Sequence, residues 1–140
     1  MAVTATPIYP QSLFVKTTQF LPADTTTAKE ILAVQTNGIK VENILVTSTD
    51  TSARDLVLYI RQSSTNYLLG TYTIPANSGN TNALVAINLF TVATTALPTS
   101  TDSNGNKFLY LDSGTSLQAS MGTSITAAKL VNVHVTGSNF

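Results

Sequence analysis

The stretch Lys129-Leu130-Val131-Asn132-Val133-His134-Val135-Thr136 decides the fold class, because three valines alternate in it with Asn132 and His134. Successive side chains of a β-strand point to opposite faces, so the alternation predicts a strand with one face in a core and the other outside. His134, the one histidine of the chain, then points away from the core. Such a strand requires a layered β-structure that covers its valine face.

Short apolar runs continue through the chain on the N-terminal side of this strand. The further expected strands are Leu13–Phe20, Glu30–Thr36, Ile39–Thr49, Asp55–Gln62, Tyr67–Ile74, Leu84–Thr91, Lys107–Leu111 and Ser116–Met121. Leu84–Thr91 also fits a short buried helix, but its Val, Ile and Phe residues and its β-rich surroundings favour a strand. No segment carries a sustained helical stripe. Short β-runs separated by turn signals predict an all-β fold, an antiparallel β-sandwich that is jelly-roll-like.

Turn residues between the runs predict how neighbouring strands connect. Asn37-Gly38 lies between two apolar runs, which is a strong signal for a hairpin. Asp112-Ser113-Gly114 predicts a second hairpin, between Lys107–Leu111 and Ser116–Met121. Residues 93–106 are expected to form a long loop that ends in a tight polar turn.

The N-terminal residues 1–11 are expected to form an extended arm. Pro7 and Pro10 flank Ile8 and Tyr9, and proline lacks the amide donor that the interior of a strand needs. Two apolar side chains on such an arm need a surface to cover, on the same subunit or on a neighbour. The length of 140 residues suits one domain, so residues 12–140 are expected to form a single β-sandwich domain.

The composition points to a surface that other proteins cover. Charged residues make up only 10% of the chain, against about 25% in average proteins. Thr, Ser and Asn supply the polar surface instead, and neutral groups cost less to desolvate than charges. The alternative is a soluble β-domain that is merely poor in charge. The formal net charge is zero and no basic patch is visible, so we expect no nucleic-acid partner, and no apolar run is long enough to predict a membrane span.

The residues that carry chemistry are few and scattered. The chain has no cysteine, and its one histidine lacks a local partner for a metal cluster or a nucleophile. Nothing in the sequence pairs the seven carboxylates. Asp102-Ser103-Asn104-Gly105-Asn106 departs from the calcium-loop pattern, so a tight turn is favoured over a weak cation site. We therefore expect no enzyme activity, no catalytic residue, no metal and no cofactor.

The whole chain resembles the small decoration or cement proteins of tailed-bacteriophage capsids. The resemblance lies in the start Met1–Ala5, the loop Ile74–Gly79, the run Asn104–Leu111 and the ending Val131–Phe140. It implies a jelly-roll-like virion protein, made in the host cytoplasm, that sits on the outer capsid surface at symmetry axes. It also implies two partners: the major capsid protein, whose subunits it bridges, and itself, in a dimer or trimer.

Three residues are the expected contacts in this role. Ile8 and Tyr9 on the arm are the first, and Phe140 at the C-terminus is the next. A tail or fibre component is an alternative, because the quoted segments also suit other phage β-proteins. A carbohydrate- or receptor-binding β-module is another, since five tyrosines are available as stacking platforms, although tyrosine in a strand more often packs across strands.

Overall fold

This computed structural model describes residues 9–91 and 97–140, and the fold is built almost wholly from strands. The elements are β1 (Ser12–Phe20), the short 3₁₀ helix η1 (Pro22–Asp24), β2 (Lys29–Leu32), β3 (Ile39–Ser48), β4 (Arg54–Gln62), β5 (Thr65–Ile74), β6 (Ile87–Asn88), β7 (Ser100–Thr101), β8 (Lys107–Leu111), β9 (Thr115–Met121) and β10 (Val131–Asn139).

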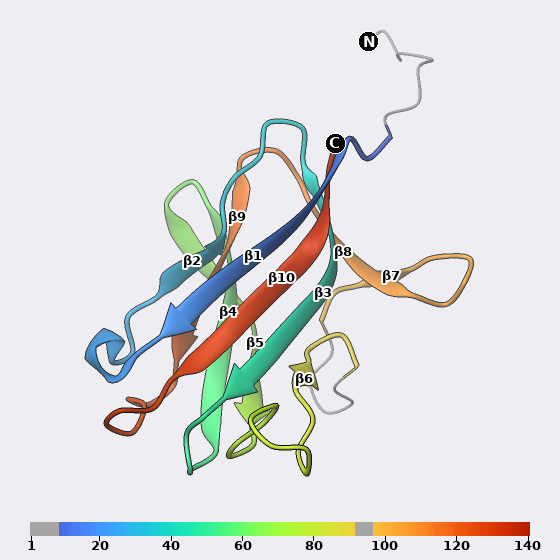
Figure 1. Ribbon diagram of the computed structural model, residues 1–140. Helices are drawn as coiled ribbons and strands as arrows, with labels where there is room; N and C mark the ends of the chain where they lie inside the picture. Colours follow the sequence, from blue (N-terminus) through green and yellow to red (C-terminus); the bar gives the residue numbers. More distant parts are fainter. Residues whose placement is uncertain (1–8, 92–96) are drawn as a thin grey trace, which may run out of the picture.

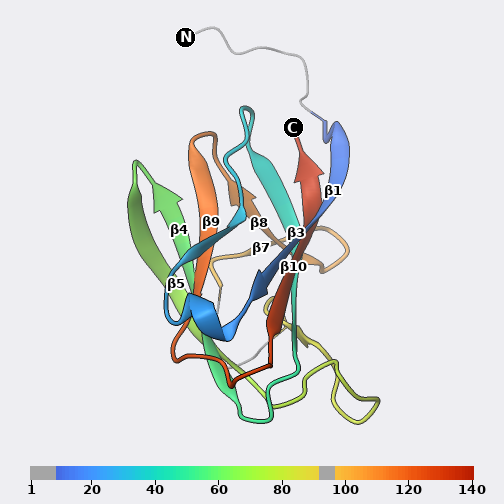
Figure 2. The ribbon, with the colours of Figure 1, turned by 60° about the vertical axis from the view of Figure 1, so that its left-hand side comes forward.

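The strands form two antiparallel sheets that face each other (Figures 1 and 2). Sheet A has the order β1-β10-β3-β8-β7, with the short β6 on β3, and sheet B has the order β2-β9-β4-β5. When β6 and β7 are left out and the remaining eight strands are renumbered along the chain, sheet A has the order 1-8-3-6 and sheet B has the order 2-7-4-5. This back-and-forth order is that of a jelly roll. The expected antiparallel, jelly-roll-like sandwich is confirmed.

The facing sides of the sheets make the core, and strand alternation explains which residues enter it. Val131, Val133 and Val135 of β10 are fully buried, whereas Asn132 and His134 between them are partly exposed. β4 follows the same rule with its buried leucines at positions 56 and 58. Burial of such side chains is the main favourable term in folding.

Both expected hairpins are wrong. Asn37 and Gly38 do form a turn, but β2 before it pairs with β9 in sheet B, and β3 after it pairs with β10 and β8 in sheet A. The turn at Asp112–Gly114 likewise joins β8 of sheet A to β9 of sheet B. A turn signal reports a local reversal of the chain, whereas strand pairing depends on partners that are distant in sequence.

The expected strand Leu84–Thr91 is wrong for most of its length, because only Ile87 and Asn88 form a strand, which pairs with β3, while Leu84 makes an isolated bridge with Thr81. Leu89 and Phe90 are buried, but Val85 is 79% exposed, so this apolar run covers one end of the core as a series of turns. The expected strand Glu30–Thr36 also ends early, at Leu32. In the expected long loop, residues 92–96 lie outside the described residues, and two residues of the remainder form β7.

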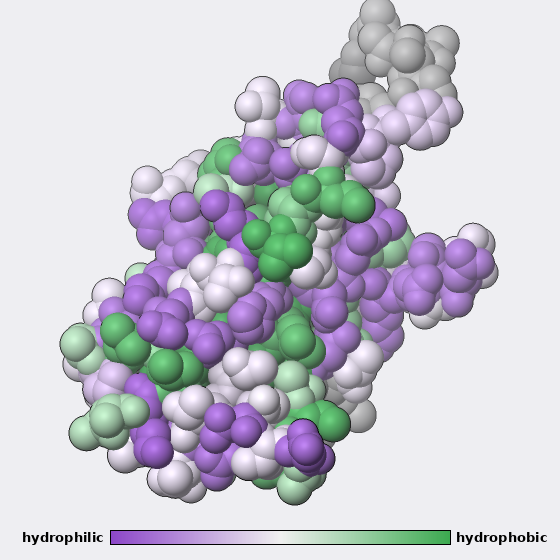
Figure 3. Space-filling view, in the orientation of Figure 1, coloured by the Kyte–Doolittle hydropathy of each residue, from purple (hydrophilic) through white to green (hydrophobic). Residues whose placement is uncertain are grey.

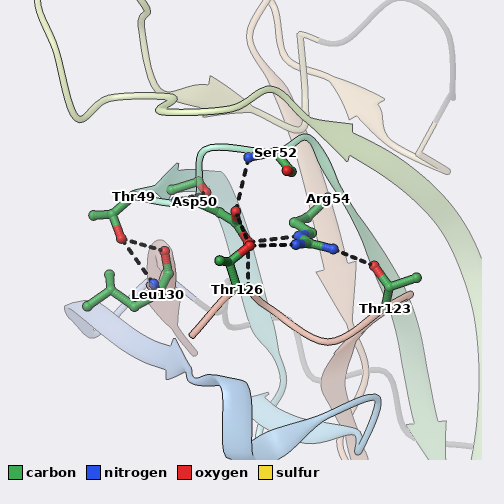
Figure 4. A network of polar contacts seen from close by, with 8 residues as sticks. Thr49, Asp50, Ser52, Arg54, Thr123, Thr126 and Leu130 are labelled. Atoms are coloured by element: carbon green, nitrogen blue, oxygen red, sulfur yellow. Dashed lines mark hydrogen bonds and ion pairs between the residues drawn. The ribbon is translucent and has the colours of Figure 1, made fainter. Parts of the chain in front are cut away.

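A buried polar clamp holds the β3–β4 turn against the segment between β9 and β10 (Figure 4). The carboxylate of Asp50, which is fully buried, accepts hydrogen bonds from Arg54 Nε at 2.7 Å and from the amide of Ser52 at 3.0 Å. It also accepts hydrogen bonds from the amide and the hydroxyl of Thr126, at 2.9 and 2.8 Å. Arg54 donates further hydrogen bonds to the hydroxyls of Thr123 and Thr126, at 3.1 and 2.8 Å.

The clamp keeps the Asp50 carboxylate charged inside the protein. Burial by itself would raise the pKa of this carboxyl, but the hydrogen bonds from Thr126, Arg54 and Ser52 outweigh it and hold the pKa well below its usual range. Asp50 therefore ties together two loops that are far apart in the sequence.

Candidate functional site

Two of the three expected contact residues, Tyr9 and Phe140, lie at the end of the sandwich where β1 begins and β10 ends (Figure 1). Ile8 lies outside the described residues. Tyr9 precedes β1 and its side chain is 69% exposed, while Phe140 follows β10 and is partly buried. The amide of Gln11 donates to the carbonyl of Asn139 at 2.7 Å, so the start of β1 is bound to the end of β10. The structure thus brings Tyr9 and Phe140 to the same end.

Two apolar side chains of β1 extend this end into a larger contact surface. Leu13 is 83% exposed and Val15 is 69% exposed. Because Phe20 is buried and Phe14 packs against the core, alternation places Leu13 and Val15 on the outer face of sheet A. In Figure 3, which views this face, hydrophobic side chains interrupt the hydrophilic surface along β1.

An aromatic cluster lies across the same end of sheet A. The ring centroid of Tyr110 is 4.8 Å from that of Phe108, edge-on, and 5.8 Å from that of Phe140. Tyr110 is exposed, and it borders a shallow hollow of about 360 Å³ together with Phe140 and the turn at Gly38. The hollow is wide enough to receive an apolar side chain of another protein.

We call Tyr9, Leu13, Val15, Tyr110 and Phe140 the arm-end face. Strand register places Leu13 of β1 and Tyr110 of β8 at the two sides of the sheet, with residues of β10 and β3 between them. The face therefore has an apolar group at each side and a polar strip in the middle.

The outer face of sheet A beyond this end is neutral and internally hydrogen-bonded. Thr17 and His134 share a hydrogen bond of 3.1 Å, and the Gln19 amide donates to Asn132 at the same distance. In each of these cross-strand pairs, the two side chains satisfy each other's hydrogen-bonding groups without an ion pair. A partner can cover such a face without stranding an ion.

Lys40 and Glu42 supply an opposite-charge pair on this side of the sheet, 3.0 Å apart. The hydrogen bond to Glu42 raises the pKa of Lys40, so the ammonium group stays charged and paired. Lys40 Nζ also lies 5.0 Å from the ring centroid of Phe108. The charge of the lysine is thus balanced inside the chain.

The Asp102 loop is a self-contained turn. One carboxylate oxygen of Asp102 accepts the amides of Asn104 and Asn106, each at 2.8 Å, and the other oxygen accepts the side-chain amide of Asn106. The hydrogen bond from the Asn106 amide lowers the pKa of Asp102 more than any other contact does. Its acceptor oxygens are therefore already used by the turn. Within residues 9–91 and 97–140, no group of three or more His, Asp or Glu side chains is placed to hold a metal.

Exposed tyrosines do not form one platform. Tyr110 borders the hollow at the arm end, Tyr9 precedes β1, and Tyr67 lies in β5 of the other sheet. A stacking site for a sugar needs such rings side by side in one groove. This spread gives less support to glycan binding than to protein docking.

The sequence pattern misses Leu13 and Val15 as contact residues. It predicts their strand correctly, but a run that begins Leu-Phe-Val shows no clear alternation, so nothing marks which side chains face out. Only the burial of Phe20, which the folded chain shows, fixes the alternation that places these two side chains outward.

Comparison with known proteins adds no assignment. No family model matches the chain, and no curated protein sequence matches it. In the part of the chain that the structure describes, no helix is both long and apolar enough to cross a membrane.

Proposed function

We propose that this chain is a structural virion protein of a tailed bacteriophage, which binds the outer capsid and cements neighbouring major capsid subunits. The observation that carries the proposal is the arm-end face, where Leu13, Val15, Tyr9 and Tyr110 are 58% to 83% exposed beside an outer sheet face on which Lys40 and Glu42 pair with each other. Exposed apolar groups on a neutral surface are the pattern of a face that another protein covers.

The two kinds of side chain on this surface have different roles. Leu13 and Val15 gain the most from leaving water, so they supply affinity. The hydroxyl and amide pairs around them, such as Thr17 with His134, lose little on burial because their hydrogen bonds are already made. The aromatic hollow beside Phe140 adds a shaped contact for a side chain of the capsid subunit.

A jelly roll is compatible with this role. The fold occurs in viral capsid domains and also in lectins, so function has to be argued from the surface. The resemblance to capsid decoration proteins and the arm-end face support the same choice. The spread of exposed tyrosines over separate elements gives the carbohydrate-binding alternative less support.

Stabilisation of the shell would follow from mass action. A subunit that binds the assembled shell and not its separated subunits lowers the free energy of the closed shell by an amount that grows with its concentration over its Kd. One copy that touches two capsid subunits resists their separation. Neither a cofactor nor a chemical reaction is needed for this.

Replacing Leu13 and Val15 together with serine is expected to weaken capsid binding about 100-fold, because burial of each side chain contributes about 1.5 kcal/mol or more. The measurement is co-sedimentation of the purified protein with capsids that lack it, over a range of concentrations. Ile8→Ser with Tyr9→Ser tests the arm in the same assay and is also expected to lower occupancy.

The matched control is Leu84→Ser with Val85→Ser, an identical pair of substitutions at side chains that are 43% and 79% exposed. This pair lies on the segment before β6, at the other end of the molecule from the start of β1 and the end of β10 (Figure 1). Its occupancy should equal that of the unmodified protein. Unchanged occupancy of the Leu13 and Val15 variant, or an equal loss in the control, would refute the assignment of the arm-end face.

A further inference from the structure

The outer face of sheet B carries opposite charges at the two ends of one strand. Because Leu56 and Leu58 of β4 are buried, the alternate residues Asp55, Val57, Tyr59 and Arg61 point outward. The acid lies at one end, the base at the other, and two large apolar side chains lie between them. Leu68 of β5, which is 64% exposed, is the cross-strand neighbour of Tyr59 and enlarges the apolar centre.

The two end charges are left without opposite charges inside the chain. The ion pairs among the described residues are Lys29–Asp24, Lys40–Glu42 and Arg54–Asp50, so neither Asp55 nor Arg61 takes part in one. Neutral neighbours hold them in place: Thr73 donates to Asp55 at 2.8 Å, and Arg61 donates to Asn66 at 3.3 Å. Both charges are thus positioned on the surface and available to a partner.

We infer that a second copy of this chain packs face to face on the outer face of sheet B. The two-fold axis runs through the interface, across the strands, at the level of Leu58. Rotation about this axis lays β4 antiparallel on β4 of the second copy. Asp55 then faces Arg61 of the second copy, Arg61 faces its Asp55, and Val57 faces its Tyr59.

Self-complementarity is the reason that a second copy is the occupant. An isologous interface needs one surface that matches itself, and an acid and a base at equal distances from the centre of a strand meet this condition. A two-fold axis along the strands would instead place Asp55 against Asp55, which is repulsive. Glu30, the other charged side chain of this face, lies on the short strand β2 at the edge of the sheet, where solvent and salt screen it.

The size of the face suits a modest, reversible dimer. Ser116, Gln118 and Ser120, the outward residues of the central strand β9, are only 2% to 6% exposed in the single chain. Strands β4 and β5 therefore supply most of the contact, which spans roughly 300 Å² at about 3.3 Å per residue along the strands and about 4.8 Å between them. A standard interface buries about 800 Å² on each partner, so this contact is smaller than a standard one and its dimer is weak. Sheets pack in this manner about 10 Å apart, with their strands nearly aligned.

Sheet edges are less suitable for self-association than this face. Lys16 lies in the middle of the edge strand β1 and is exposed, although the alternation of the strand places it on the side that faces the core. A charge at this place on an edge strand discourages the addition of another strand. The other long edge strand, β5, has a shift of register opposite Leu58 and Tyr59, which twists it away from regular pairing. Face-to-face packing avoids both obstacles.

Charge reversal tests the proposed pairing. Asp55→Lys alone and Arg61→Glu alone should each weaken self-association about tenfold or more, because each places like charges opposite one another twice in the dimer. An equimolar mixture of the two variants should restore it, because every contact in the mixed dimer is again between opposite charges. Sedimentation equilibrium of the full chain, at about 100 μM and low salt, measures the three samples against the unmodified protein.

The matched control reverses Lys107 and Glu42, an exposed base and an exposed acid of sheet A, by Lys107→Glu and Glu42→Lys, and should leave self-association unchanged. Thermal unfolding of each variant verifies the fold. A monomeric unmodified protein, single variants that associate normally, or a mixture that stays monomeric would each overturn the inference. Capsid binding by the sheet B variants should stay intact, so this result is separate from that of the arm-end face.

Discussion

Replacement of Asp50 with alanine is expected to lower the free energy of unfolding by about 3–5 kcal/mol, which is a large share of the stability of an ordinary domain. The change removes a fully buried carboxylate and leaves Arg54 Nε and the hydroxyl and amide of Thr126 without their acceptor. Buried donors without a partner keep their full desolvation cost. Urea unfolding followed by circular dichroism measures the loss.

Glu30→Ala is the control for Asp50→Ala, because Glu30 is an exposed carboxylate on β2 that takes no part in the clamp. Its effect should stay within about 0.5 kcal/mol. A loss of the same small size for Asp50→Ala would show that the clamp does not stabilise the fold.

The free energy of unfolding should also depend on pH through Asp50. The pKa of Asp50 is lowered in the folded protein, so the unfolded chain binds the proton first as the pH falls. The stabilisation is complete above the ordinary carboxyl pKa of about 4 and is lost as the pH falls from there toward the lower folded value. Asp24 and Asp102, whose pKa values are also lowered, contribute in the same direction. The free energy of unfolding of the unmodified protein and of Asp50→Ala is measured against pH. The difference between the two isolates the contribution of Asp50, and this difference should shrink below about pH 4.

The substitution Gly137→Ala is expected to destabilise the protein by about 3 kcal/mol, at the upper end of the cost of overpacking. A Cβ at this position would lie 2.1 Å from the carbonyl oxygen of Lys40 and 3.1 Å from Cζ of Phe14. The first of these contacts is to backbone, so β10 and β3 would have to separate where the register shifts. Thermal and urea unfolding measure the loss.

Gly114→Ala provides the comparison for Gly137→Ala. Gly114 has a φ of 82° and open space around its Cβ position, so alanine there costs only the left-handed backbone conformation, about 1 kcal/mol. Equal losses at the two glycines would show that the close approach of β10 to β3 is not tight.

Sequence pattern predicts the strands well wherever alternation is strong. The valines of β10 and the leucines of β4 identify both the strand and the face that enters the core, as the structure confirms. Pairing is a different matter, because it is not encoded in any one segment. Asn37-Gly38 and Asp112–Gly114 both read as hairpin turns, yet each carries the chain from one sheet to the other. The β-sandwich could therefore be predicted, while its connections could not.

The role of Asp50 could not be predicted from the sequence either. In the sequence it flanks the polar Thr51-Ser52 turn, for which a turn-forming acid is the ordinary interpretation. Its strongest contacts include Thr126, which lies in the segment between β9 and β10 and is 76 positions away in the sequence. Only the folded chain brings these two residues together.

The candidate site was predictable in part. The arm and the C-terminus are expected contacts from their prolines and aromatic residues, and Tyr9 and Phe140 do lie at one end of the molecule. Leu13 and Val15 could not be predicted as exposed, because that depends on β1 being an edge strand with Phe20 anchored in the core. The charge pattern of Asp55 and Arg61 required the outward face of β4 to be known.

The most direct test of the proposed role is electron cryo-microscopy of purified capsids saturated with this protein. Our account predicts density for the jelly roll at symmetry-related positions on the outer surface, with the arm end, marked by Leu13, Val15 and Phe140, against two neighbouring capsid subunits. Density confined to the tail, or subunits attached with the arm end directed into solvent, would contradict it.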